Sequence, residues 1–178
     1  MTFDEAFTRL IGHEGAYTAD PSDNGNWTGG RPGVGVLLGT KYGIAANTYP
    51  DVDIKNLTLD AAKAIYRRDW WDKINAGQME PAIVYQVWDF AINAGMSTAK
   101  RALQRAVRVA DDGHIGPVTI RAVCAMGTSD VLMRFNAQRI RYYTSLTLWP
   151  TYGKGWANRV ASNLDYAAED DGPQIATT

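Results

Sequence analysis

Three oxygen-bearing side chains near the N-terminus have the types and spacing for acid-assisted hydrolysis. Glu14 follows a predicted helix, Asp23 comes nine residues later, and Thr28 comes five residues after that. Cleavage of a glycosidic bond needs a proton donor for the leaving oxygen and a second polar group that holds a water or stabilises the oxocarbenium-like centre. Glu14 is our candidate donor, with Asp23 and Thr28 as candidates to orient the water. Asp23 precedes Asn-Gly, so it also fits ordinary turn chemistry.

The local sequence predicts that Glu14 stays protonated near neutral pH. Gly12 and Gly15 interrupt the helical pattern close to Glu14, and the dipole at a helix C-terminus disfavours a negative charge. The neighbouring residues offer little polar solvation, which also raises a carboxyl pKa. A glutamate at a helix end is more often a simple surface residue, so this argument depends on its surroundings.

The elements that must position these residues differ along the chain. Phe3, Phe7 and Leu10 give a helical apolar stripe before Glu14, whereas residues 16–50 are rich in Gly, Pro, Asn and Asp and predict a small irregular β lobe. From Thr58 onward the apolar spacing is helical. Two late helices are predicted at about 129–147 and 154–169, and three earlier ones are predicted to start at Thr58, Pro81 and Pro117.

Several motifs resemble glycoside hydrolase family 108. Glu14-Gly15-Ala16-Tyr17 is similar to its Glu-Gly-Gly-Tyr signature, with Ala16 in place of the second Gly. The segment Asp20–Thr28 resembles its Asp-Pro-Gly-Gly-x-Thr, and Tyr42-Gly43-Ile44 matches its Tyr-Gly-Ile. Residues 29–40 separate the last two motifs as a Gly-rich insertion. The resemblance implies that Glu14 is the catalytic acid.

The order Glu14, Asp23, Thr28 also resembles the catalytic triplet of small phage lysozymes, although the spacing to Thr28 is one residue shorter here. We therefore predict Glu14, Asp23 and Thr28 as catalytic residues. Tyr42, Trp88 and Asn93 are our candidates to line the sugar subsites, and of these Trp88 also fits a plain core position.

The second half resembles the peptidoglycan-binding region that accompanies this family. Asp89–Gly95 is similar to one of its helices, Ala102-Leu103-Gln104 to its Ala-x-x-Leu-Gln, and Asp112–Thr119 to its Asp-Gly-x-Ile-Gly-Pro-x-Thr. The last motif also has a structural interpretation, as a turn followed by proline at a helix start.

These observations predict a mainly α, lysozyme-like α+β fold, in which a helical bundle lobe and a small N-terminal β lobe form a cleft. We expect a single domain over residues 1–178, with a catalytic lobe at 1–78 and a helical lobe at 79–170. The function that the resemblance implies is that of an endolysin hydrolysing the β-1,4 bond between N-acetylmuramic acid and N-acetylglucosamine. Alternatives are a lytic transglycosylase acting on the same bond and a non-enzymatic wall-binding protein.

Charge is unevenly distributed. The whole chain has a net charge of −1, but residues 97–160 contain ten Lys or Arg against three Asp, a net charge of +7. Such a segment favours an anionic partner. We expect peptidoglycan as the partner of a monomeric protein, and no nucleic acid. Arg134, Arg139 and Arg141 lie on a predicted amphipathic helix that we hypothesise faces an anionic wall or outer-membrane surface, although its apolar face also fits core packing.

The sequence predicts no cofactor and no metal site, because His13 and His114 have no partners at zinc-ligand spacing. Cys124 is the single cysteine and is expected to be a buried, inert thiol. We find no signal segment at the N-terminus. The expectation is synthesis in the cytoplasm and action on the cell wall, in the periplasm, after release from a phage-infected host.

Overall fold

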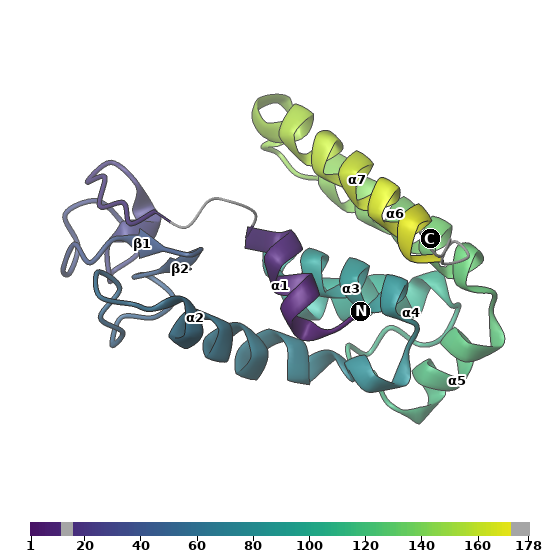
Figure 1. Cartoon of the computed structure of the whole chain (residues 1–178). Coiled ribbons are helices and arrows are strands. Elements are labelled where there is room, and N and C mark those ends of the chain that lie inside the picture. Colours follow the sequence, from purple (N-terminus) through teal and green to yellow (C-terminus); the bar gives the residue numbers. More distant parts are fainter. Residues whose placement is uncertain (12–15, 172–178) are drawn as a thin grey trace, which may run out of the picture. The chain divides into compact units, whose positions relative to one another are not determined.

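A computed structural model describes residues 1–11 and 16–171, which form two compact units (Figure 1). The first, which we call the β-containing unit, comprises Phe3–Asp69. The second, the helical unit, comprises Met1–Thr2 and Trp70–Thr178. Most of the described residues are helical, and the only sheet among them has two strands. The predicted mainly α class with a small N-terminal β region is confirmed.

The β-containing unit holds two helices and one hairpin. The helices are α1 (Phe3–Ile11) and α2 (Leu59–Tyr66), and the antiparallel strands are β1 (Thr40–Lys41) and β2 (Ile44–Ala45), with a short 3-10 turn η1 (Asn24–Asn26) before them. The apolar face of α1 packs on α2, since the Phe7 ring meets the Tyr66 ring edge-on at 5.5 Å between centroids. Lys63 Nζ adds an ion pair to Asp4 at 2.6 Å. These contacts fix the helix that precedes Glu14 in the chain.

The start of α2 has the physical cause that the sequence predicts. The Thr58 hydroxyl accepts a hydrogen bond from the Ala61 backbone N–H at 3.2 Å, which satisfies one of the free donors at the helix start. A π-helical segment η2 (Arg67–Trp71) continues from α2.

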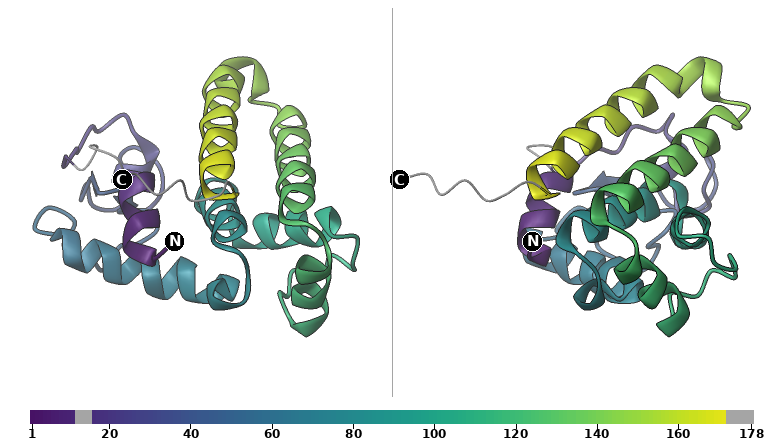
Figure 2. Two further views of the ribbon diagram at one scale, coloured as in Figure 1. Left: turned by 45° about the vertical axis from the view of Figure 1, so that its right-hand side comes forward. Right: turned by 90° about the vertical axis from the view of Figure 1, so that its right-hand side faces the viewer.

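The helical unit is built around α3. Its elements are η3 (Asp72–Ile74), η4 (Ala76–Gln78), α3 (Pro81–Ala94), α4 (Met96–Ala106), α5 (Pro117–Ala125), α6 (Thr128–Thr144) and α7 (Trp149–Asp171). Ten consecutive residues of α3 are buried, because the helix packs against α4, α6 and α7. Figure 2 shows α6 and α7 side by side as a helical hairpin, in agreement with their mutual contacts.

Predicted helix starts at Pro81 and Pro117 are confirmed, and α3 ends at Gly95, whose φ of 91° favours glycine. The last helix begins five residues earlier than predicted, at Trp149 rather than 154. Pro150 lies in its first turn, where proline costs no internal hydrogen bond. Gly153 lies against the Trp149 ring, which a Cβ would approach to 2.7 Å, so this glycine serves packing and does not end a helix.

One expectation on burial is wrong. Cys124 is exposed on α5 and lines a surface cavity of about 370 Å³ with Gln78, Val123 and Met126. The helix buries only Thr119 and Val123, so the Cys124 thiol is exposed although the sequence of α5 is apolar.

Within the part of the chain that the structure describes, no helix is long and apolar enough to cross a membrane.

Candidate functional site

Glu14 and His13 lie outside the described residues, so the role predicted for Glu14 stays a prediction. The described part of α1 ends at Ile11. Among the other predicted site residues, the β-containing unit holds Asp23, Thr28 and Tyr42, and the helical unit holds Trp88 and Asn93.

Asp23 caps the η1 turn. Its Oδ1 accepts a hydrogen bond from the Gly25 backbone N–H at 2.8 Å, and the side chain is exposed. The ordinary turn chemistry that the sequence suggests is therefore present. Because only Oδ1 is used among the described residues, Oδ2 is open to a water molecule, so capping and catalysis are compatible roles for this carboxylate.

Thr28 anchors the Gly-rich insertion. Its hydroxyl accepts a hydrogen bond from the Val36 N–H at 2.9 Å, and its own N–H donates to the Val36 carbonyl at 3.0 Å. A second pair, from the Gly29 N–H to the Val34 carbonyl at 3.1 Å, closes the loop further. The insertion is thus a closed loop that begins at Thr28, and the Thr28 hydroxyl proton is still available for donation.

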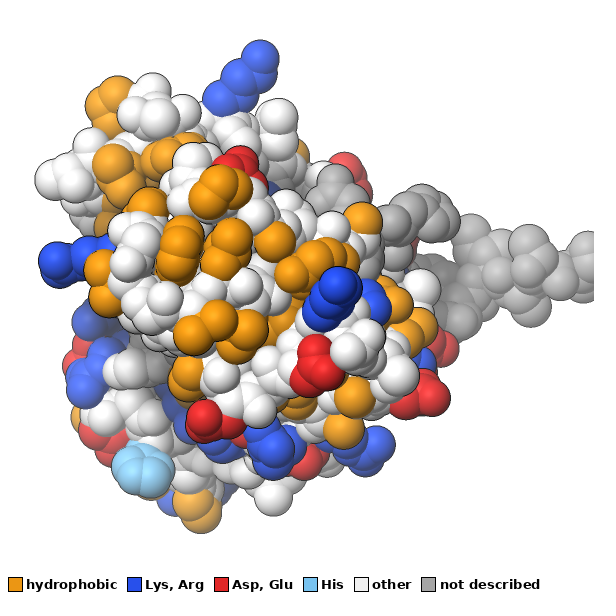
Figure 3. Space-filling view, turned by 90° about the vertical axis from the view of Figure 1, so that its left-hand side faces the viewer, with side chains coloured by type: hydrophobic (Ala, Val, Ile, Leu, Met, Phe, Trp, Pro, Cys, Tyr) orange, Lys and Arg blue, Asp and Glu red, His pale blue; other side chains and the backbone are white. Residues whose placement is uncertain are grey.

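The insertion presents apolar side chains to solvent. Val34 and Val36 are 49% and 60% exposed, and Tyr17, which precedes the insertion in sequence, is 38% exposed. Figure 3, which faces the β1–β2 end of the chain, shows hydrophobic side chains gathered among polar atoms. Apolar side chains of this kind can contact the apolar faces of sugar rings.

Tyr42 and Gly43 form the two-residue turn between β1 and β2. Both have positive φ, 50° and 73°, as a type I′ hairpin requires. The Tyr66 hydroxyl donates to the Tyr42 carbonyl at 3.2 Å, and a Cβ on Gly43 would come within 2.4 Å of that hydroxyl. The Tyr-Gly-Ile motif therefore has a structural cause, and the half-buried Tyr42 ring contacts Lys41 Nζ at 5.4 Å.

Asn26 is a central residue of this region that sequence patterns do not single out. It is fully buried; its amide donates to the Asp20 carbonyl at 3.0 Å, and its Oδ1 accepts from the Thr40 hydroxyl at 2.7 Å. Its backbone carbonyl also accepts from the Leu38 and Gly39 N–H groups. Nothing in the sequence separates it from the exposed turn residues around it.

Asp20 itself has a lowered pKa, because the Ser22 N–H and hydroxyl donate to its carboxylate.

Trp88 is fully buried in α3. Its ring meets Trp71 edge-on at 5.5 Å and lies 6.5 Å from the Tyr85 ring. No face of the ring is open to a sugar in this structure, so burial argues for the core position and against a subsite role. Asn93, one turn after Asp89, is exposed, and its amide donates to the Asp89 carbonyl at 2.7 Å.

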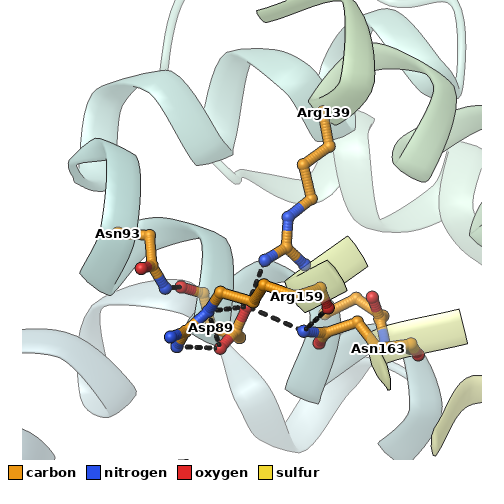
Figure 4. Close-up of polar contacts among 6 residues, drawn as sticks. Asp89, Asn93, Arg139, Arg159 and Asn163 are labelled. Carbon is orange, nitrogen blue, oxygen red and sulfur yellow. Dashed lines mark hydrogen bonds and ion pairs between the residues drawn. The ribbon is translucent and has the colours of Figure 1, made fainter. Parts of the chain in front are cut away.

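Asp89 is the centre of a buried polar cluster in the helical unit (Figure 4). Arg139 Nη2 donates to its Oδ2, Arg159 Nη2 donates to its Oδ1 at 2.5 Å, and Asn163 Nδ2 donates to Oδ2 at 3.1 Å. The side chain of Asp89 is 2% exposed and that of Arg139 is 0% exposed. The cluster joins α3, α6 and α7.

This cluster corrects the hypothesis of one outward basic face on α6. Arg139 is not on the surface: it lies on the buried stripe of α6, together with Leu132, Phe135 and Tyr143. The spacing of these positions already places Arg139 on the apolar side of the helix. Its guanidinium group is fully buried and paired with Asp89, so it cannot contribute to binding an external surface.

The motif over Asp112–Thr119 is held by Gln104. Gln104 Nε2 donates to Asp112 Oδ1 at 2.7 Å and to the His114 carbonyl at 3.0 Å, and its Oε1 accepts from the Gly113 N–H at 2.8 Å. The bonds from Gln104 and from the His114 N–H lower the pKa of Asp112. These contacts support the structural interpretation of the motif, a turn that leads into α5.

Residues that could hold a metal are absent from the described chain, since no group of three or more His, Cys, Asp or Glu comes together there.

The structural comparison defines the class of protein: a mostly helical, lysozyme-like fold. The structure of SagA from Brucella abortus matches with a TM-score of 0.81 and 28% sequence identity over 97% of both chains.

The model of the glycosyl hydrolase 108 family matches residues 7–95, and the model described as a predicted peptidoglycan domain matches residues 98–161. The chain belongs to the glycosyl hydrolase 108 family. No curated protein matches it. The two matches together define a glycosidase that acts on peptidoglycan, and they confirm the resemblance seen in the motifs.

Proposed function

We propose that this protein is an endolysin that hydrolyses the β-1,4 bond between N-acetylmuramic acid and N-acetylglucosamine, with Glu14 as the general acid. The observation that carries the proposal is the glycosyl hydrolase 108 match, which spans Glu14 and its Glu-Gly-Ala-Tyr motif. A phage-infected host is the setting we infer, with the cell wall as the place of action. Within the chain, we assign residues 1–78 to the catalytic lobe and 79–170 to the helical lobe.

In this proposal Glu14 protonates the leaving glycosidic oxygen. Asp23 Oδ2, which no described residue occupies, accepts a proton of the attacking water, and the Thr28 hydroxyl helps to orient that water. Tyr42 and Asn93 remain as proposed sugar-binding residues, since the Tyr42 ring is half-buried and Asn93 is exposed.

The decisive experiment is product analysis of purified peptidoglycan digested by the wild type, by Glu14→Gln and by Asp23→Ala. A general acid contributes about 10²–10⁴-fold in rate, so Glu14→Gln should lower the release of reducing ends by at least about a hundredfold while the protein stays folded. Asp23→Ala should also lower it strongly. Glu80→Gln, the same change at an exposed carboxyl, is the control and should keep activity within about twofold.

Mass spectrometry of the wild-type products tests the reaction itself. Hydrolysis gives reducing N-acetylmuramic acid ends, whereas a lytic transglycosylase gives anhydro sugars, and a non-enzymatic wall-binding protein gives no products. Near-native activity of a folded Glu14→Gln variant would remove Glu14 from the mechanism.

A further inference from the structure

An arginine-lined cavity of about 300 Å³ lies between α4 and α6 in the helical unit. Four arginines, two alanines and one glutamine line it, and no acidic residue does: Arg105, Ala106, Arg108, Arg134, Ala137, Gln138 and Arg141. All seven residues fall inside the segment that matches the predicted peptidoglycan domain.

The shape of the cavity follows from helix geometry. Arg134 and Arg141 are seven residues apart, so they lie two turns apart on the same face of α6. Ala137 lies between them on that face, and Ala106 is at the end of α4, which packs against α6. The side chains of Ala106 and Ala137 are short and lie among long arginine side chains. They therefore leave space between the packed helices α4 and α6.

The positive charge of the cavity is largely uncompensated. Arg105 Nε pairs with Asp111 Oδ2 at 2.6 Å, but in the described chain Arg108, Arg134 and Arg141 form no ion pair. Arg134 Nε is buried and has no hydrogen-bond partner among the described residues. A buried cationic N–H without an acceptor is costly. An anion bound in the cavity would offset the positive charge of this guanidinium group.

Arg108 adds an independent observation. It directly follows the last turn of α4 with a φ of +61°, in the left-handed region where glycine or asparagine is usual. For another residue type this conformation costs about 1–2 kcal/mol. The Arg108 side chain is exposed and lines the cavity.

We propose that this cavity binds carboxylates of the peptide stems of peptidoglycan. Guanidinium groups match carboxylates in charge and in fork geometry. The acetylated glycan of a peptidoglycan strand is uncharged, and its anionic groups are the free carboxylates of the attached peptides. The site rests on the proposed substrate, and it replaces the broad basic face expected from sequence with one defined pocket.

The test is co-sedimentation with sacculi free of teichoic acid, at 4 °C and low salt, using the full chain. Arg108→Gln/Arg141→Gln removes two exposed charges from the cavity and should weaken binding about tenfold. The control, Arg121→Gln/Lys154→Gln, removes two exposed charges outside the cavity and should change binding less than twofold. Thermal unfolding verifies that both variants fold.

A second arm identifies the ligand group. Sacculi whose carboxylates have been converted to neutral amides with carbodiimide and methylamine should bind the wild type about as weakly as untreated sacculi bind the cavity variant. Equal losses in the cavity and control variants, or undiminished wild-type binding to the neutralised sacculi, would overturn the proposal.

Vesicles containing phosphatidylglycerol test the other source of anionic groups. If the cavity variant loses vesicle binding but retains sacculus binding, the site serves lipid headgroups and the proposal is wrong. The release of reducing ends is measured separately on the same samples. Absence of cleavage by the wild type would refute the proposed function, whereas only the binding comparison decides the role of the cavity.

Discussion

At the scale of single residues, Asp89 pairs with two guanidinium groups at once. Arg139 is completely buried, whereas Arg159 is 36% exposed, so the buried partner depends on Asp89 more strongly. Burial of ions is expensive, and a buried pair is roughly neutral in stability only while both partners are present. Removal of the carboxylate would leave the Arg139 charge uncompensated in the core.

We predict that Asp89→Asn destabilises the protein by about 3–5 kcal/mol, the range for breaking a buried pair at one partner. Chemical denaturation followed by circular dichroism measures this loss. Asp165→Asn, on the exposed side of α7, removes the same charge without a buried partner and should change the free energy of unfolding by less than about 0.5 kcal/mol. A loss below about 1 kcal/mol at Asp89 would show that Arg139 finds other compensation.

The contacts of single residues are the feature of this protein that its sequence predicts least. The motif around Asp89 is recognisable, but its partners lie 50 and 70 residues away, and no local pattern pairs them. Arg139 has a usable signal, its position on the apolar stripe of α6, which its charge obscures. Asn26 has no such signal in the sequence, because the hydrogen bonds that hold it in the interior join it to Asp20 before it and to Thr40 after it in the chain.

At the scale of elements, the closed loop over residues 28–36 determines where the Thr28 hydroxyl points. Gly35 has a φ of +78°, and a Cβ there would come within 2.2 Å of Thr28 Oγ1 and 3.0 Å of the Gly29 nitrogen. Gly33, in the same loop, has a φ of +79°, but a Cβ there would meet no atom within 4 Å. The two glycines therefore share backbone strain and differ in steric contact.

We predict that Gly35→Ala lowers peptidoglycan cleavage at least about tenfold, because it displaces Thr28, while Gly33→Ala keeps activity within about threefold. Both substitutions carry the strain of a left-handed alanine, about 1 kcal/mol, so the comparison isolates the contacts with Thr28 and the Gly29 backbone. Release of reducing ends and thermal unfolding are measured for each variant. Equal activities of the two variants would show that the position of the Thr28 hydroxyl does not matter for turnover.

Three helix starts are predictable from the sequence, because a single side chain favours each of them. Thr58 caps α2 with its hydroxyl, and Pro81 and Pro117 occupy first turns in which the missing N–H has no cost. The path of the insertion is not predictable in this way, because the Thr28–Val36 bonds that close it join residues with no periodic pattern.

At the scale of the whole molecule, the buried apolar side chains are unequally divided between the two units. In α3 alone, ten of fourteen residues are buried, and they contact three other helices. The β-containing unit has strands of two residues each, and its segment from Thr28 to Val36 is held mainly by hydrogen bonds within the loop and exposes Val34 and Val36. Local opening is easiest where few apolar contacts are lost.

We therefore predict that amide hydrogen exchange separates the two units. The amides of α3 should exchange slowest, through opening of the whole helical unit, whereas those of residues 28–38 should exchange at least about a hundredfold faster through local opening. Exchange is measured residue by residue by NMR under native conditions, and Asp89→Asn serves as the matched perturbation. Because Asp89 joins α3 to α6 and α7, that variant should accelerate exchange in α3 and leave residues 28–38 unchanged. Uniform protection along the chain, or equal acceleration of both segments by Asp89→Asn, would mean that the two units unfold as one cooperative body.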